Sequence, residues 1–182
     1  MAFSKIIAES MDLTDAYNFT GTLQQNGAGI GGDNKPAFHA YANTNQTGLS
    51  DNTWVKLQMN VEDLDTDSAY DHSSNYRFTP QTAGKYLIYL HAVIFSESAN
   101  QGYVFNGSIY KNGTNVAYSA NNNNSSHPEY EKSMFLVKTI DFNGSSDYVE
   151  AYGRLNVLSG NWATSSSSTG TLCYFGGYKL IT

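Results

Sequence analysis

The sequence predicts an all-β fold, an antiparallel sandwich or jelly roll, on three observations. No segment carries apolar residues at helical spacing over several turns, whereas apolar and polar residues alternate in many short segments. Turn-forming residues separate these segments, and the Asn112-Gly113 pair is typical of a two-residue hairpin, since both positions of a type I′ turn need positive φ. Eight or more antiparallel strands in one chain of this length are typical of a sandwich or jelly roll.

The expected strands begin at Pro36, a residue that is tolerated at a strand start. The second expected strand, 53–61, alternates Val55, Leu57, Met59 and Val61 with polar residues. All of the expected strands, in chain order, cover residues 36–43, 53–61, 76–80, 84–96, 102–119, 132–142, 147–157 and 171–181.

The strand expected at 84–96 is apolar on both faces. Tyr86, Ile88 and Leu90 would point to one side, and Leu87, Tyr89 and His91 to the other. An antiparallel strand usually buries one face and exposes the other to water. We therefore expect one face of this strand to lie in the core and the other to be covered by a partner, such as a second copy of the chain.

The composition excludes several classes of function. Charged residues make up only 14% of the chain, against a usual value of about 25%. The net charge of −6 argues against a nucleic-acid partner and against an anionic membrane surface. No apolar run is long enough to span a bilayer, so we expect no membrane insertion, and the opening residues lack the apolar segment of a signal peptide.

Residues 1–35 differ in composition from the rest of the chain. A mildly apolar segment, 3–23, is followed by the glycine-rich stretch 25–34. We interpret residues 1–35 as an anchoring arm with a glycine-rich hinge, and residues 36–182 as one β domain.

An acidic stretch, 62–71, is the candidate metal site. Its residues Asp63, Asp65, Asp67 and Asp71 have the spacing of oxygen ligands in a calcium loop. Ser68 stands where such a loop needs glycine, and Ser74 where it needs glutamate. The competing interpretation is a solvated acidic turn, and calcium is the only cofactor that the sequence suggests.

No motif indicates catalysis, so we expect no catalytic residues. The sequence has no nucleophile elbow, no phosphate-binding loop and no pair of histidines at a metal-ligand spacing. Cys173 lies in an apolar strand without a matched base, and we expect a core thiol. A glycan-cleaving enzyme would need paired carboxylates, and Glu129 and Glu131 are the only close glutamate pair in a loop.

Two polar loops, 121–130 and 160–170, each carry an aromatic residue, Tyr130 and Trp162. An exposed aromatic residue on a polar loop is a typical anchor for a glycan or a protein partner. The alternative for Trp162 is that it folds back as a cap over the core.

Several residues spread along the chain resemble the signature of the C1q globular head. Phe78, Gly84, Tyr86, Ile88 and Leu90 keep the order of its central motif, with Ile88 and Leu90 in place of aromatic residues. Met59, Asp65 and Tyr70 match positions upstream, and Phe175 and Gly177 match the closing strand. The resemblance covers residues 36–182.

This resemblance implies a jelly roll of the C1q and tumour necrosis factor superfamily that assembles as a homotrimer. One face of 84–96 would then lie near the three-fold axis. The calcium ligands of the family precede the strand at 131–143, and the matching loop here contains no aspartate, so those ligands are not carried over.

Residues 5–23 resemble the short arms that begin many phage tail and head-surface proteins. Together with the low charge, this implies a structural protein of a phage particle, made in the host cytoplasm, displayed on the virion surface and docked on other virion proteins through residues 1–30. The alternative is a receptor- or glycan-binding tip of a short tail fibre. A third interpretation is an enzyme that degrades glycans.

Overall fold

The structure is a computed structural model that describes Gln24–Gln25, Ala28–Gly29 and residues 34–181. The chain divides into two compact units, Met1–Gly32 and Asp33–Thr182. In the first unit, β1 (Gln24–Gln25) pairs antiparallel with β2 (Ala28–Gly29). Most of the predicted arm lies outside the described residues, so its role stays a prediction.

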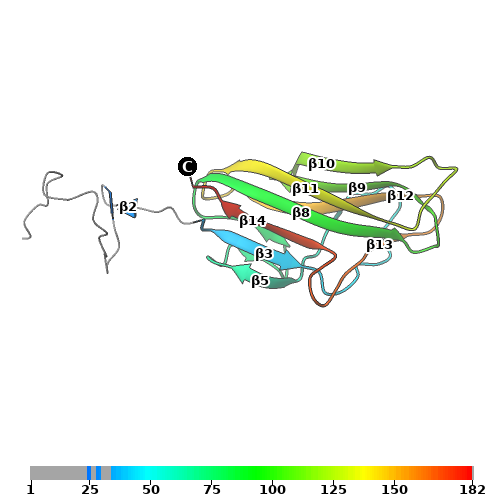
Figure 1. The fold of residues 1–182 in the computed structure, drawn as a ribbon, viewed down its shortest axis with the longest axis horizontal. Coiled ribbons are helices and arrows are strands. Elements are labelled where there is room, and N and C mark those ends of the chain that lie inside the picture. Colours follow the sequence, from blue (N-terminus) through cyan, green and yellow to red (C-terminus); the bar gives the residue numbers. More distant parts are fainter. Residues whose placement is uncertain (1–23, 26–27, 30–33, 182) are drawn as a thin grey trace, which may run out of the picture. The chain divides into compact units, whose positions relative to one another are not determined.

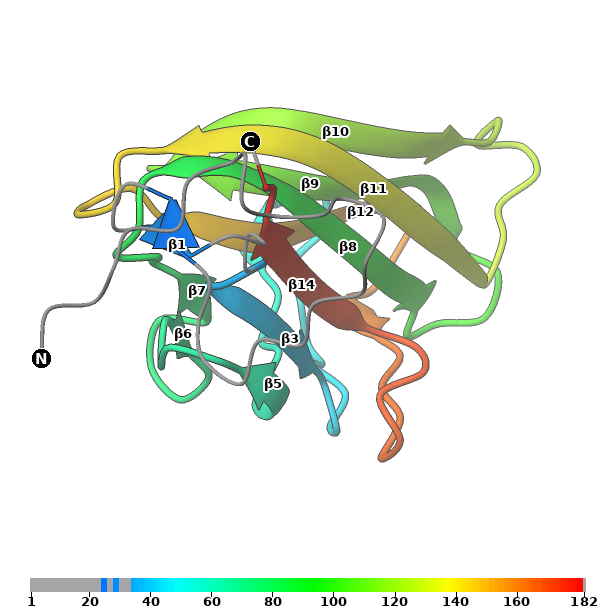
Figure 2. The same cartoon turned by 60° about the vertical axis from the view of Figure 1, so that its left-hand side comes forward.

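The second unit is built from two antiparallel sheets, as predicted, and its described residues contain no helix. The first sheet, here the β8 sheet, has the strand order β11-β8-β14-β3-β5, with β13 also paired to β8 (Figures 1 and 2). Its strands are β3 (Ala37–Tyr41), β5 (Val61–Asp65), β8 (Gly84–Ser96), β11 (Glu131–Phe142), β13 (Trp162–Thr164) and β14 (Tyr174–Lys179). None of the described residues belongs to a helix long and apolar enough to span a membrane.

The second sheet, here the β9 sheet, has the order β10-β9-β12-β7-β6, with β4 also paired to β12. Its strands are β4 (Val55–Lys56), β6 (Tyr70–Asp71), β7 (Arg77–Phe78), β9 (Gly102–Lys111), β10 (Thr114–Asn122) and β12 (Val149–Val157). The predicted hairpin joins β9 to β10. Asn112 and Gly113 both have positive φ, 50° and 77°, which confirms the type I′ turn.

Two predictions of single elements were wrong. The segment 53–61 is not one strand, because β4 pairs with β12 in the β9 sheet whereas β5 pairs with β3 in the β8 sheet. Between them, Leu57 and Met59 are buried as the alternation predicted, but the chain crosses from one sheet to the other there. The predicted loop 160–170 contains β13, which pairs with the end of β8.

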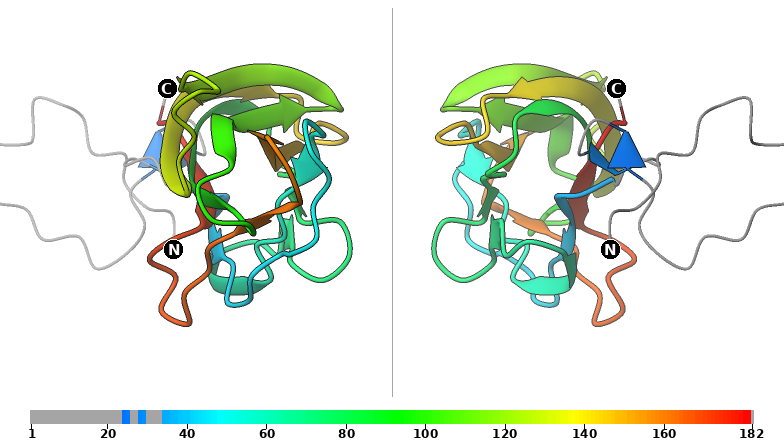
Figure 3. Two further views of the ribbon diagram at one scale, coloured as in Figure 1. Left: turned by 90° about the vertical axis from the view of Figure 1, so that its right-hand side faces the viewer. Right: turned by 90° about the vertical axis from the view of Figure 1, so that its left-hand side faces the viewer.

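The core lies between the two sheets, whose strands surround it in the end-on views of Figure 3. Aromatic rings fill much of it. Phe38 stacks on Phe78 with ring centroids 4.2 Å apart and meets Phe175 edge-on at 5.1 Å. Aromatic pairs in these geometries add about 0.5–1.5 kcal/mol each beyond the burial of their area. Cys173 is buried in this core, as predicted, and burial raises the pKa of its thiol to about 11.

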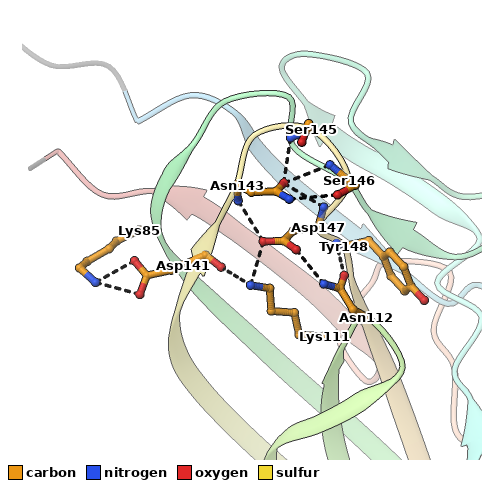
Figure 4. Close-up of polar contacts among 9 residues, drawn as sticks. All are labelled: Lys85, Lys111, Asn112, Asp141, Asn143, Ser145, Ser146, Asp147 and Tyr148. Atoms are coloured by element: carbon orange, nitrogen blue, oxygen red, sulfur yellow. Dashed lines mark hydrogen bonds and ion pairs between the residues drawn. The ribbon is translucent and has the colours of Figure 1, made fainter.

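A polar network closes one end of the sandwich (Figure 4). The side-chain oxygen of Asn143 accepts the backbone N–H groups of Ser145, Ser146 and Asp147 at 3.0–3.1 Å. The Asp147 carboxylate accepts the backbone N–H of Asn143 and pairs with the Lys111 ammonium at 2.8 Å. Asn112 also donates to Asp147, at 2.7 Å, so the turn after β9 is tied to the turn after β11.

Candidate functional site

Strand β8 has one face in the core and one face turned outward. The candidate interface was one face of the strand that carries Tyr86 to His91, and Tyr86, Ile88 and Leu90 form the face that is fully buried between the sheets. Leu87, Tyr89 and His91 lie on the opposite face and are only half-buried. The structure therefore leaves the odd-numbered face as the candidate site.

Neighbouring strands extend this outward face. On β11, Phe135 lies opposite His91 and Val137 opposite Tyr89, and these two side chains are 59% and 52% exposed. On β14, Tyr174 lies opposite His91. We call the surface that these strands form with β3 and β5 the β8 face, and its members are His39, Leu64, Leu87, Tyr89, His91, Phe135, Val137 and Tyr174.

Two polar side chains of the β8 face are turned to each other. The Tyr89 hydroxyl and the His39 Nδ1 are 2.8 Å apart. Tyr89 lies across β14 at Gly176, where a Cβ atom would collide with the tyrosine ring. Burial, with a smaller contribution from the charge of Asp63, raises the pKa of Tyr89 to about 12, so its hydroxyl stays neutral at physiological pH.

His91 differs from the Tyr89–His39 pair because one of its ring nitrogens lacks a hydrogen-bond partner among the described residues. Its ring stacks on Tyr174 with centroids 5.0 Å apart. Its Nδ1 is buried and has no hydrogen-bond partner in the part of the chain that the structure describes. The face thus combines aromatic rings and aliphatic side chains with a few hydroxyl and imidazole groups, which suits docking of another apolar surface better than chemistry on a substrate.

The four aspartates of the acidic stretch are not brought together as a metal site. The Asp65 carboxylate accepts the backbone N–H groups of Ala69 and Tyr70 at 3.0 and 2.9 Å. The Asp71 carboxylate instead accepts those of Ser73, Ser74 and Asn75, and these bonds lower its pKa. In the described residues, no group of three His, Cys, Asp or Glu side chains could hold a metal ion. Asp63, Asp65, Asp67 and Asp71 are therefore not gathered around one point in the described residues, and calcium binding stays a prediction.

The two aromatic residues proposed as ligand anchors differ in burial. Trp162 is fully buried in β13, and its Nε1–H donates to the Ser50 carbonyl at 2.8 Å. The cap interpretation is therefore correct for Trp162, and the ligand interpretation is wrong. Tyr130 is exposed at the surface, with its ring 5.4 Å from that of Phe95.

The two glutamates expected in one loop, Glu129 and Glu131, both make local contacts, and Glu131 is the first residue of β11. Glu129 pairs with Lys132 and accepts a hydrogen bond from Asn123, whereas Glu131 accepts one from the Ser165 hydroxyl at 2.7 Å. These contacts give each carboxylate a structural partner.

The sequence reasoning missed the contribution of β11 to the site. Phe135 and Val137 alternate with Met134 and Leu136, which are buried in the core. This segment is apolar on both faces, as 84–96 is, so the sequence pattern could have indicated that β11 contributes to the site. The contributions of His39 and Tyr174 depend on strand order, which alternation does not reveal.

Comparisons with known proteins establish the fold. No family model matches the chain, and no curated protein does. Among solved structures, murine APRIL at pH 5.0 superposes with a TM-score of 0.55 and 13% identity over 79% of this chain and 98% of that one. The globular domain of the zebrafish complement 1qA protein superposes with a TM-score of 0.55 and 13% identity over 81% of this chain and 98% of that one. The fold is thus the predicted jelly roll of the C1q and tumour necrosis factor kind.

Proposed function

We propose that this chain is a non-enzymatic domain that forms a homotrimer through the β8 face. The observation that carries the proposal is the exposure of Phe135 and Val137 beside the half-buried Tyr89 and His91. Apolar surface of this kind on one sheet face marks an interaction site. The similar structures belong to the C1q and tumour necrosis factor kinds, whose members are homotrimeric, and this supports three copies as the occupant.

The chemistry of the β8 face suits contact between identical subunits. Among the described residues, none of its named members forms an ion pair that would have to lose its water, and the Tyr89 hydroxyl already meets the His39 Nδ1 within the subunit. Burying apolar area contributes about 25 cal/mol per Å². In a closed three-fold assembly, the β8 face of every subunit would be buried in the same way.

A charge placed in this face tests the proposal. Val137→Lys should abolish the trimer, because a lysine there would be buried without a partner. Asn115→Lys, which adds the same charge at an exposed position of β10 in the other sheet, should leave the trimer intact. Light scattering coupled to size exclusion gives the masses, and circular dichroism shows that each variant is folded. A Val137→Lys protein with the wild-type mass contradicts the assignment of the interface.

We propose further that the trimer is a surface knob of a phage particle, held on other virion proteins through residues 1–30. The low charge and the likeness of residues 5–23 to the arms of phage tail and head-surface proteins support this role. Antibodies raised against residues 33–182 should label the surface of purified phage particles in electron micrographs. Particles that lack the protein would contradict the virion role without affecting the trimer.

A further inference from the structure

A second cluster of aromatic and polar side chains lies on the outer face of the β9 sheet, away from the β8 face. Its strand residues alternate with Phe105, Ile109 and Leu155, which are fully buried in the core, so they point to the outer surface. We call the cluster the β12 patch, and its members are Trp54, Asn106, Tyr110, Tyr118, Tyr152 and Arg154.

Arg154 is the central residue of the β12 patch. Its Nε and Nη2 donate to the Oδ1 of Asn106 at 3.0 and 2.8 Å, and Asn106 is fully buried. Its Cζ lies 4.9 Å from the centroid of the Trp54 ring. The guanidinium is therefore fixed in place by a buried amide on one edge and by an aromatic ring on one face.

The fixed guanidinium has no anionic partner among the described residues. Within the described residues, Arg154 makes no ion pair, and its Nη1 meets no acceptor. The cation on the neighbouring strand β4, Lys56, is by contrast paired with Glu150 at 2.6 Å. A guanidinium presents five N–H donors in a rigid fork, and its distal edge matches a carboxylate in a two-pronged contact. Among the described residues, no acceptor meets the Nη1 group of that edge.

Aromatic rings surround the Trp54 side chain that lies over the guanidinium. Trp54 is half-buried and makes edge contacts with Tyr110 and Tyr118, at centroid distances of 6.1 and 6.2 Å. Tyr118 is 53% exposed, and its hydroxyl accepts a hydrogen bond from Asn106 at 3.3 Å. A ring with an apolar body and a polar tip can pack against the C–H face of a sugar and bond its hydroxyls.

We propose that the β12 patch binds an acidic sugar. Arg154 pairs with the sugar carboxylate, and Trp54 and Tyr118 contact the sugar ring. The buried Asn106 holds the guanidinium in position through its Oδ1. Charge complementarity selects a carboxylate-bearing sugar over a neutral one, and the aromatic rings select a sugar over a free carboxylate. The site differs from the loop positions Tyr130 and Trp162 that the sequence suggested, and it does not depend on the trimer.

Tryptophan fluorescence offers a direct readout. The chain has two tryptophans, and Trp162 is fully buried, so a change of emission on ligand addition reports Trp54. The full chain is titrated with sialyllactose against lactose, and with trigalacturonate against its methyl ester. At least one acidic member should bind, at least about tenfold more tightly than its neutral counterpart, because a charge-assisted contact is lost in the latter. Acetate and hexaglutamate serve as a free carboxylate and an acidic peptide.

Variants of the chain's two arginines complete the test. Arg154→Gln should weaken binding of the acidic sugar at least about tenfold, and Arg154→Lys should retain only part of the affinity, since lysine keeps the charge without the fork. Arg77→Gln removes the other arginine, which lies over Tyr148 at 4.5 Å, and should leave binding unchanged. Melting temperatures show that each variant is folded.

Four results overturn the proposal: no change of emission with either acidic sugar, equal binding of the neutral counterparts, full affinity in both Arg154 variants, or tighter binding of hexaglutamate. The last result would assign the patch to an acidic peptide.

Discussion

At the scale of single residues, the positions that resemble the C1q signature have structural roles here. Phe78, Tyr86 and Phe175 are fully buried in the core, where Phe78 and Phe175 both contact Phe38. Asp65 accepts backbone N–H groups within the turn that precedes β6. The signature therefore describes how the sandwich is filled and how one turn is closed, and it carries no information about a ligand.

Trp162 gives a residue-scale prediction about the core. Trp162→Ala should lower the free energy of unfolding by about 3–5 kcal/mol, because it leaves a large cavity and the Ser50 carbonyl loses its donor. Tyr130→Ala, at an exposed ring, should change it by less than about 1 kcal/mol. Urea denaturation measures both. A Trp162→Ala protein as stable as the wild type would contradict the burial of this ring.

The acidic stretch gives a second prediction. Millimolar calcium should raise the melting temperature by less than about 2 °C, because Asp65 and Asp71 already bind backbone N–H groups of different turns. Magnesium at the same concentration is the control for ionic strength. A larger shift with calcium that disappears in the double variant Asp63→Asn and Asp67→Asn would show that a site forms on binding.

At the scale of elements, the closed end of the sandwich depends on ionised carboxylates. The hydrogen bonds and ion pair of Asp147 with Lys111, and the bonds from Asn112 and Asn143, lower the pKa of Asp147. Because this pKa is lower in the folded chain than in the unfolded chain, the carboxylate favours folding at pH values above its unfolded pKa of about 3.9. That contribution is lost as the pH falls through the folded pKa.

Asp147→Asn should therefore lower the melting temperature at pH 7 and make its fall between pH 6 and pH 2 less steep. Asp141→Asn is the matched control, since Asp141 and its partner Lys85 are 72% and 54% exposed and such pairs contribute little. The Asp71 carboxylate, whose pKa is also lowered, should leave part of the acid dependence in the variant. Parallel pH profiles for Asp147→Asn and the wild type would contradict the role of the network.

Local patterns predicted the elements well where strands are long. Alternation located β8 and β11, and the Asn112-Gly113 pair located the hairpin, because these features depend on neighbours in sequence. Alternation failed at 53–61, since burial of Leu57 and Met59 looks the same whether the chain stays in one sheet or crosses to the other. Likewise, the polar residues around Trp162 concealed a short strand that only pairing with β8 stabilises.

At the scale of the whole molecule, the two sheets present different outer faces. The β8 face gathers aliphatic and aromatic side chains with few free polar groups, whereas the β12 patch holds a fixed cation among aromatic rings. Strand order decides both surfaces, because it places residues from distant segments in the same row, such as Phe135, His91 and Tyr174. This is why the sequence predicted a covered face on one strand but neither the full extent of that face nor the patch.

Self-association through the β8 face is the central claim, and the mass of the wild-type chain in solution tests it most directly. Sedimentation equilibrium of the purified full chain at micromolar concentration should give three times the chain mass of 20.0 kDa. The result should hold in high salt, because none of the named members of the β8 face forms an ion pair among the described residues that salt would screen. A single species at 20.0 kDa across the concentration series would contradict the account.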